Sequence, residues 1–330
     1  MGCNDARRAR ACCYVSISLC IFGLVLIGGS VAFANHGPGA SGGGAATISG
    51  ETLKPGHFEV ELREDFSQFQ TFTRNQAIER ANIGGDFDAL DHGFLTTVSG
   101  AFGVMEDFQV GAGFGYFVGN DFESASVDNG VTNFGRTNPT GFTDLVVTGK
   151  YRVLQGQPGN LAIITGVVFP TGTDDQRLNN GEFLTPTDQP GTGRWAIPFG
   201  LGYSRFLTSQ VTVDASVLYT YRFEQAGFKV GDRFDAGVAL AYRITKSIKS
   251  FPQFSVFAEV NNVYLTHDED HGVRDPNSGS ATLYVTPGLR VRFNPTMALT
   301  LAPSIPVFEH LNGDQGRVDY KIAASLSFAF

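Results

Sequence analysis

Charged side chains recur at alternate positions in several apolar stretches of this chain. Alternate residues of an extended chain point to opposite faces, so the charges share one face and the apolar residues the other. Charges of both signs on a common face could attract and select charged or polar solutes. They could equally pair with one another as a structural network, and the sequence leaves both readings open. The candidate lining residues are Glu59, Glu61, Arg63, Asp144, Lys150, Arg152, Asp214, Arg222, Arg233, Asp235, Arg243, Glu259, Arg290 and Arg292.

A second candidate is the segment 267–271, which reads HDEDH. Histidine and carboxylate are suitable ligands for a divalent cation. The segment nevertheless lacks the spacing of a calcium-binding loop and lies between predicted strands. We interpret it as a solvated acidic loop and predict no metal site.

No recognisable catalytic motif is present. The chain has no phosphate-binding loop, and its glycine spacings that match G-x-S-x-G or G-x-G-x-x-G fall in the Gly-rich stretch 37–43, which does not follow a predicted strand. A lipid-modifying enzyme is an alternative that would need a nucleophile and a base close together. We predict a protein that is not an enzyme, with no catalytic residues and no cofactor.

The elements that would position the charges are β-strands. Segments of roughly ten to fourteen residues with period-2 alternation follow one another along the chain. We predict twelve strands, at 57–69, 92–104, 107–118, 141–154, 160–169, 194–206, 210–223, 233–245, 252–264, 281–293, 297–307 and 318–330.

The connections between these segments alternate in length. Those after the even-numbered strands are short, whereas those after odd-numbered strands, such as 119–140 and 170–193, are longer and polar. Outer-membrane barrels have short periplasmic turns, long external loops and an even number of strands. We therefore predict an all-β fold, a transmembrane antiparallel barrel of about twelve strands with both termini in the periplasm. The apolar faces would contact lipid and the charged faces the lumen.

The first 34 residues have the pattern of a secretory signal peptide. Three arginines precede an almost uncharged stretch, and Ala32-Phe33-Ala34 fits the small-x-small cleavage rule. An uncleaved anchor is the alternative, because the apolar stretch approaches the length of a membrane span. We predict three parts: a signal peptide at 1–34, a flexible Gly-rich segment at 35–56 and an outer-membrane barrel at 57–330.

Cleavage would also change the composition of the chain. All four cysteines fall within residues 3–20, so the processed chain would have no disulfide and no thiolate site. Losing three arginines and Asp5 would change the formal charge from −8 to −10, which argues against a nucleic-acid partner.

The chain ends on an alternating segment, with Tyr320, Ile322, Leu326, Phe328 and Phe330 on one face. A closing strand with an apolar face and a terminal aromatic residue is typical of outer-membrane barrels. We predict the outer membrane of a Gram-negative bacterium as its location. The expected partners are membrane lipid, lipopolysaccharide, a small-molecule solute and, through the strand ending at Phe330, the barrel-assembly machinery.

Three segments carry a resemblance to a known family. They are residues 143–152 (TDLVVTGKYR), 168–172 (VFPTG) and 191–205, which contains GTGRW and LGYSR. The chain resembles the outer-membrane barrels grouped with the phenol meta-pathway degradation family, and its lead-in at 36–44 is similar to that of a subgroup. The resemblance implies a barrel that passes small apolar or aromatic compounds, and it brings no agreed binding residues.

The sequence as a whole predicts an outer-membrane channel for passive uptake or efflux of small solutes. The lumen charges and the N-terminal segment would control access. The alternative is a structural or surface-interaction barrel with a blocked lumen that acts through its acidic loops.

Overall fold

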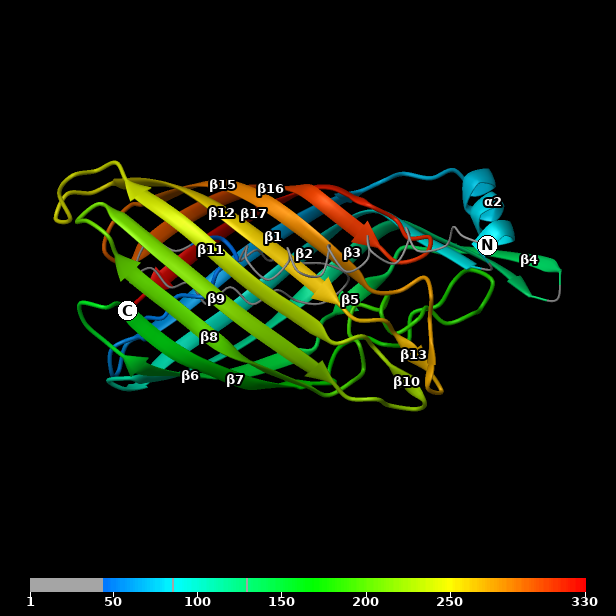
Figure 1. The fold of residues 1–330 in the computed structure, drawn as a ribbon, viewed down its shortest axis with the longest axis horizontal. Coiled ribbons are helices and arrows are strands. Elements are labelled where there is room, and N and C mark those ends of the chain that lie inside the picture. Colours follow the sequence, from blue (N-terminus) through cyan, green and yellow to red (C-terminus); the bar gives the residue numbers. More distant parts are fainter. Residues whose placement is uncertain (1–43, 85, 129) are drawn as a thin grey trace, which may run out of the picture.

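The computed structural model describes residues 44–84, 86–128 and 130–330, and these form a tilted β-barrel (Figure 1). The predicted signal peptide and the first part of the predicted Gly-rich segment, up to residue 43, lie outside the described residues. The strands around the barrel are β1 (Phe58–Phe69), β2 (Asp86–Met105), β3 (Phe108–Asp128), β6 (Leu145–Leu154), β7 (Asn160–Phe169), β8 (Ala196–Phe206), β9 (Val211–Arg222), β11 (Arg233–Arg243), β12 (Gln253–Leu265), β15 (Ser280–Arg292), β16 (Met297–Leu311) and β17 (Val318–Ala329). The remaining elements are α2 (Arg74–Gly84), β4 (Val131–Thr137), β5 (Thr140–Phe142), β10 (Phe228–Lys229), β13 (Glu269–Asp270) and β14 (Val273–Arg274).

The barrel is closed. Each barrel strand pairs antiparallel with its neighbours, β1 pairs with both β2 and β17, and the β2–β3 pairing completes the ring. Phe58 and Phe330 exchange backbone hydrogen bonds of 3.1 and 2.8 Å, and their rings stack at 4.8 Å. Within the ring, closure pairs each barrel strand on both of its edges. The prediction of an all-β, twelve-stranded antiparallel barrel is confirmed.

Alternation along the strands separates two chemically different faces. On β1, Val60 and Leu62 are exposed on the outer surface, whereas Glu61 and Arg63 between them are buried inside. Exposed large apolar residues occur in the same way on the other barrel strands. An outer band of apolar side chains is what a strand facing lipid requires, because a charge there is costly.

Connection length divides the barrel into two ends. Turns such as 106–107 and 293–296 join strands at what we call the turn end, and the longer connections lie at the opposite loop end. The C-terminus lies at the turn end, and α2 lies at the loop end (Figure 1). The predicted sorting of short turns and long loops is confirmed.

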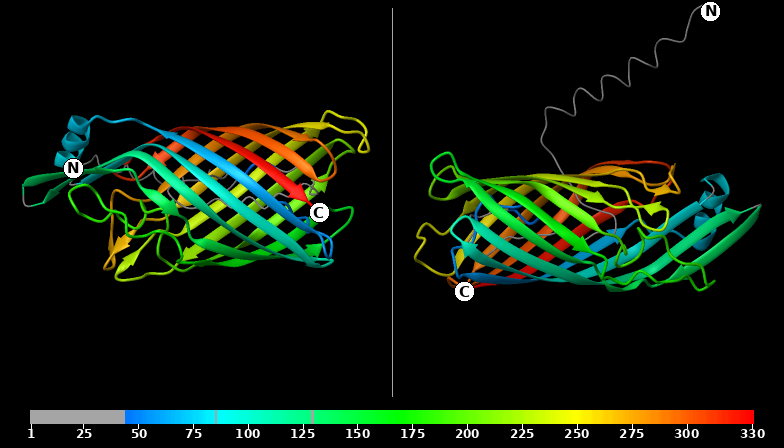
Figure 2. Two further views of the ribbon diagram at one scale, coloured as in Figure 1. Left: turned by 180° about the vertical axis from the view of Figure 1, so that it is seen from behind. Right: turned by 90° about the horizontal axis from the view of Figure 1, so that it is seen from below.

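The β2–β3 hairpin continues past the rest of the loop end, which the sequence analysis did not predict. β2 begins six residues earlier than expected, and β3 continues to Asp128 and pairs with β4, so 119–140 is not a simple loop. Figure 2 shows this extension projecting beyond the rim with α2 packed on it. Apolar packing explains the extension, because Phe87, Ala89 and Ala125 form a cluster with Ala77 of the helix.

The helix α2 was also missed, although its start has a sequence signal. Thr73 and Gln76 form a capping box, in which the Thr73 amide donates to the Gln76 side chain at 2.9 Å. The Gln76 amide in turn donates to the Thr73 hydroxyl at 3.4 Å. No helix in the described part of the chain is long and apolar enough to cross a membrane.

Candidate functional site: the barrel lumen

Residues 44–56, which we call the inner segment, run through the lumen before the chain enters β1. The amide of Leu53 donates to the Gln109 side chain at 2.8 Å, close to the turn end. Three residues earlier in the chain, the Gly50 amide donates to the Ser204 hydroxyl at 2.8 Å. The segment then reaches Glu259, near the middle of β12. It therefore occupies the turn-end half of the lumen.

Glu259 holds the deepest part of the inner segment. Its carboxylate is fully buried and accepts the amides of Ala45 and Thr47, both at 2.6 Å. The Ala46 amide lies 3.1 Å from the same carboxylate, and the Thr47 hydroxyl also donates to it. Successive main-chain amides can form a concave anion site. These donors offset the cost of burying the Glu259 charge, which would otherwise be large.

Cationic side chains of the wall bind the carbonyls of the same segment. Arg63 donates to the Ala45 carbonyl at 2.7 Å. Lys150 and Arg290 donate at 3.3 Å to the carbonyls of Ser49 and Gly44 respectively. The main chain of the inner segment is thus hydrogen-bonded to both signs of wall charge.

Glycines in the wall make room for this main chain. A Cβ atom added at Gly103 would lie 2.1 Å from the Lys54 carbonyl oxygen, and one at Gly202 would lie 2.7 Å from that of Ser49. At Gly237 it would lie 2.4 Å from the Thr47 hydroxyl. Side chains at these positions would collide with the inner segment, so the wall is shaped around it.

On the loop-end side of the inner segment, the lumen holds a cavity of about 380 Å³. Ala45 and Ala46 lie at its floor, and its wall includes Phe87, Phe117 and Phe122. Its acidic lining is contributed mainly by the extended β2 and by two long loops. Those carboxylates belong to Asp86, Asp88, Asp188, Asp268 and Asp275.

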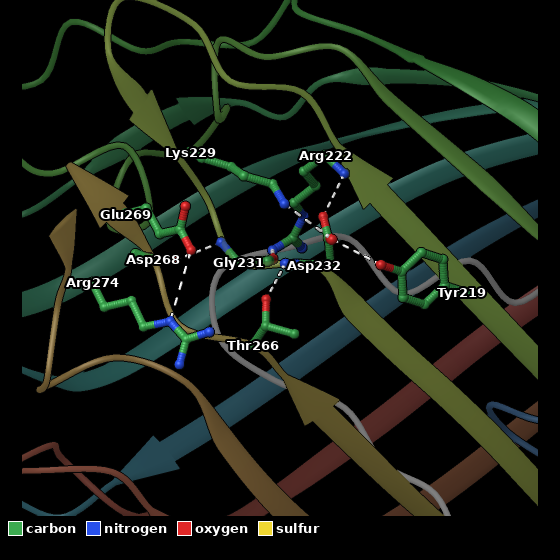
Figure 3. Close-up of polar contacts among 9 residues, drawn as sticks. All are labelled: Tyr219, Arg222, Lys229, Gly231, Asp232, Thr266, Asp268, Glu269 and Arg274. Carbon is green, nitrogen blue, oxygen red and sulfur yellow. Dashed lines mark hydrogen bonds and ion pairs between the residues drawn. The ribbon is translucent and has the colours of Figure 1, made fainter. Parts of the chain in front are cut away.

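The loop-end rim is held by a network of buried polar groups (Figure 3). Asp232 accepts hydrogen bonds from Tyr219 at 2.8 Å, from Lys229 at 3.1 Å and from the Arg222 amide at 2.9 Å. The Asp268 carboxylate accepts the Gly231 amide at 2.6 Å. These contacts join the loop between β9 and β11 to the loop between β12 and β15.

Two carboxylates of these loops titrate abnormally. Burial raises the pKa of Asp188 to about 6, and the nearby carboxylates of Asp268 and Asp275 act in the same direction. Burial also raises the pKa of Asp268. Ionising these carboxylates therefore costs electrostatic free energy that the residues around them do not fully offset.

Asp144 anchors the long loop between β7 and β8. Its carboxylate accepts the Gly172 amide at 3.0 Å at the start of this loop. Near the end of the loop it accepts both the amide and the hydroxyl of Thr192, each at 2.8 Å. Gly172 and Gly191 pack main chain against main chain, with no room for a Cβ. Residues from three separate sequence segments therefore meet at one junction.

These three segments are the ones that carry the family resemblance. A family model described as "Putative MetA-pathway of phenol degradation" matches residues 38–305. The chain belongs to this family. No curated protein sequence matches the chain.

One solved structure shares the fold of this family member, and others match it more weakly. An outer membrane channel from Pseudomonas putida F1 matches with a TM-score of 0.54 and 12% identity, covering 85% of this chain and 97% of that one. The NanC porin matches at a TM-score of 0.43 and 10% identity, with 82% and 98% covered. The CymD monoaromatic hydrocarbon channel matches at 0.39 and 13%, with 84% and 88% covered. The first match shows the fold.

The remaining predicted lining residues of this family member fall into separate groups. At the turn end, Arg152 pairs with Asp107 at 2.7 Å, while Arg243 donates to the Ser209 carbonyl. Arg243 and Arg290 flank the same residue of β12, and Arg292 is two residues further along β15, six strands away from Arg152. These turn-end arginines therefore lie on two separate walls of the barrel.

Other predicted residues lie deeper. Glu59 and Glu61 are buried on β1, and Asp214 is buried where it accepts the Ser204 hydroxyl. In the loop-end half, Arg233 pairs with Asp235 at 2.6 Å, and Arg222 donates to the Gly231 carbonyl at 2.7 Å.

The segment 267–271 differs from the solvated loop expected. Glu269 and Asp270 pair with β14 and β10, but Asp268 is buried and faces the cavity. Asp188 likewise lines the cavity. Among the described residues, no group of three or more His, Cys, Asp or Glu side chains could hold a metal ion.

Proposed function

We propose that the protein is an outer-membrane channel through which small apolar or aromatic solutes diffuse down their gradient. The observation that carries this proposal is the lumen cavity of about 380 Å³, walled by aromatic side chains inside a closed barrel. Ligand sites of that size are typically apolar with a few polar groups. Membership of the phenol-degradation family favours aromatic solutes.

In this proposal the solute path has two stages. Solutes enter the cavity from the loop end, and the inner segment then controls passage to the turn end. The predicted lining charges serve the path in two ways: Arg63, Lys150, Glu259 and Arg290 hold the inner segment, and the others line or shape the lumen. Displacement of the inner segment opens the path.

The proposal includes a location and an orientation. The loop end faces outward, and both termini are periplasmic. Residues 1–34 act as a signal peptide, 35–56 as an N-terminal segment and 57–330 as the barrel. Lipid and lipopolysaccharide surround the apolar band, and the assembly machinery recognises the strand that ends at Phe330.

The test is the conductance of refolded protein in a planar bilayer. A chain beginning at residue 35 is compared with one that also lacks residues 35–50. We expect low or gated current from the first and a larger, steady current from the second, because the deletion removes the contacts to Glu259. Folding of both is checked by the heat-dependent shift of barrels on SDS gels. Silence in both folded proteins would overturn the channel proposal.

The second candidate function is a barrel with a blocked lumen that acts through its surface loops. The specific observation in its favour is the inner segment, whose main chain is hydrogen-bonded to several wall residues. Silence of the shortened chain in the same experiment would favour this candidate.

A further inference from the structure

The cavity at the loop end carries an excess of acidic groups. Among the described residues, eight carboxylate side chains line it, against the three cationic side chains of Arg63, Arg222 and Lys321. Arg63 pairs with Asp65 at 2.6 Å, and Arg80 pairs with Asp314 from outside the cavity lining, so ion pairs neutralise two of the eight. The excess lies toward the loop end, farther from the inner segment.

The hydrogen-bond donors to Asp188, Asp268 and Asp275 are neutral. Asp268 accepts the Thr187 hydroxyl at 2.5 Å and the Gly231 amide at 2.6 Å. Asp275 accepts the Asn277 amide at 2.8 Å, and Asp188 accepts the Thr185 hydroxyl. Within the described ranges, no arginine or lysine forms an ion pair with any of these three or with Asp86 or Asp88. The charge that these carboxylates carry is therefore not cancelled locally, and burial beside Asp188 raises the pKa of Asp88 to about 8.

Apolar side chains face the same space. Phe87, Leu90, Phe117 and Phe122 contribute from β2 and β3, and Tyr284 contributes from β15. Low-dielectric walls strengthen the field of the carboxylates inside the cavity. A ligand that satisfies both features has a positive charge at one end and a hydrocarbon body at the other.

A metal ion fits less well. The described residues provide no cluster of three metal-ligating side chains. A hydrated divalent ion would also leave the aromatic wall without a partner. A neutral aromatic molecule would use the wall and gain nothing from the carboxylates.

We propose that this cavity binds organic monocations with an aromatic or alkyl body, such as arylalkylamines, in preference to neutral or anionic aromatic compounds. The ammonium group lies among Asp88, Asp188 and Asp268, and the hydrocarbon body packs on the phenylalanines. The inference deepens the proposed function and rests on it for its role in passage, because this cavity is the first stage of the proposed path.

The test uses three probes of nearly equal shape: 2-phenylethylamine, 2-phenylethanol and phenylacetate. Their binding to the folded, detergent-solubilised protein is measured by calorimetry at pH 7.5 and low salt. We expect the amine to bind at least tenfold more tightly than the alcohol, and phenylacetate to give no binding. Equal affinity for amine and alcohol, or tighter binding of phenylacetate, would overturn the proposal.

Variants localise the effect. The double variant Asp88→Asn with Asp188→Asn should weaken amine binding at least tenfold and leave alcohol binding unchanged. Glu106→Gln removes an exposed carboxylate at the opposite end of the barrel and should change neither. Unchanged amine affinity in the folded double variant would contradict the assigned site. If that variant does not fold, the three probes on the unaltered protein still decide the proposal.

The result is separable from that of the channel proposal. Amine binding together with silence in the bilayer would support the site and reject the channel. Current through the shortened chain without preference for the amine would support the channel and reject the cation site.

Discussion

The two halves of the lumen are built from the same alternating strands, but their charges are satisfied in different ways. In the turn-end half, buried Glu259 is bonded to main-chain amides, and Arg63 and Arg290 are bonded to main-chain carbonyls of the same segment. In the loop-end half, carboxylates such as Asp188 and Asp268 are bonded to hydroxyls and a lone amide around a cavity.

This difference shows what the main chain contributes to a charged lumen. A peptide segment presents donors and acceptors together, so it can pair with wall charges of both signs at once. Without such a segment, like charges on the wall remain close to one another and favour an external counter-charge. For the described residues, the same strand pattern therefore gives a closed region around the inner segment and a receptive cavity on its loop-end side.

The largest expected effect comes from Glu259→Gln. This substitution would make the turn-end half resemble the loop-end half, because the inner segment would no longer be bonded to a buried charge at this position. The substitution replaces charge-assisted hydrogen bonds by neutral ones, which are about half as strong. Because several bonds are affected, the free energy that holds the inner segment in place should fall by roughly 3 kcal/mol. The equilibrium for its displacement should rise about 100-fold. An Ile48→Cys reporter, buried in the parent, should react with maleimide correspondingly faster.

The reporter is unambiguous because the native cysteines lie within residues 3–20, ahead of the predicted processed start. Ile48→Cys combined with Glu106→Gln is the matched control and should react at the parent rate. Labelling of the Glu259→Gln protein at that same rate would mean that the amide contacts do not hold the segment.

A smaller effect is expected from Asp144→Ala, which tests how the loop between β7 and β8 is held at the loop-end half of the lumen. The substitution removes acceptors for Gly172 and Thr192 at the two ends of the loop. A hydrogen bond to a charged group is worth about 1.5–3 kcal/mol, so local opening should become roughly 30-fold easier. Trypsin cleavage after Arg177 in the folded barrel measures this opening.

Asp175→Ala provides the control, because Asp175 lies in the same loop and is exposed. Cleavage should then proceed as in the parent protein. If Asp144→Ala also leaves cleavage unaltered, the loop is held by contacts other than those to Asp144.

The smallest expected effect is a pH dependence of amine binding in the loop-end half. Burial raises the pKa of Asp188 to about 6, and Asp268 and Asp275 from the neighbouring loop and Asp88 of β2 face it. Lowering the pH from 7.5 to 5 should protonate Asp188 and weaken phenylethylamine binding by up to about tenfold, since the amine stays charged. Calorimetry at both pH values measures the change.

Asp188→Asn should flatten this dependence. Equal affinity of the unaltered protein at the two pH values would show that Asp188 does not contact the ammonium group.

The pH dependence of folding stability has the opposite sign to that of amine binding. A carboxyl group whose pKa is raised on folding stabilises the folded state at low pH. That contribution is lost as the pH rises from the ordinary value near 4 through 6.

The sequence predicts the barrel well because lipid imposes a strict alternation on each strand. The predicted bounds of 160–169 coincide with β7, and those of 210–223 differ from β9 by one residue at each end. The extension of β2 to Asp86 was missed because it lies beyond the expected strand and is stabilised by packing on α2. That helix had a usable signal in Thr73 and Gln76.

The candidate site is less predictable, because its contacts join distant parts of the chain. Alternation identifies Glu259 as a charge on the inner face, but nothing in its neighbourhood indicates that it binds the Ala45 amide. Asp188 and Asp268 lie in polar loops, which are solvated by default, and only the folding of those loops turns them toward the cavity.

The Glu259 contact also bears on the order in which the molecule assembles. Ala45 and Glu259 are separated by 214 residues in the chain. Contacts of such long sequence separation form only after many intervening residues are in place. The inner segment is the first described part of the chain to be synthesised, yet its anchor exists only once β12 has joined the sheet. The lumen of a half-assembled barrel is therefore unsealed, and docking of the inner segment is a late event in folding.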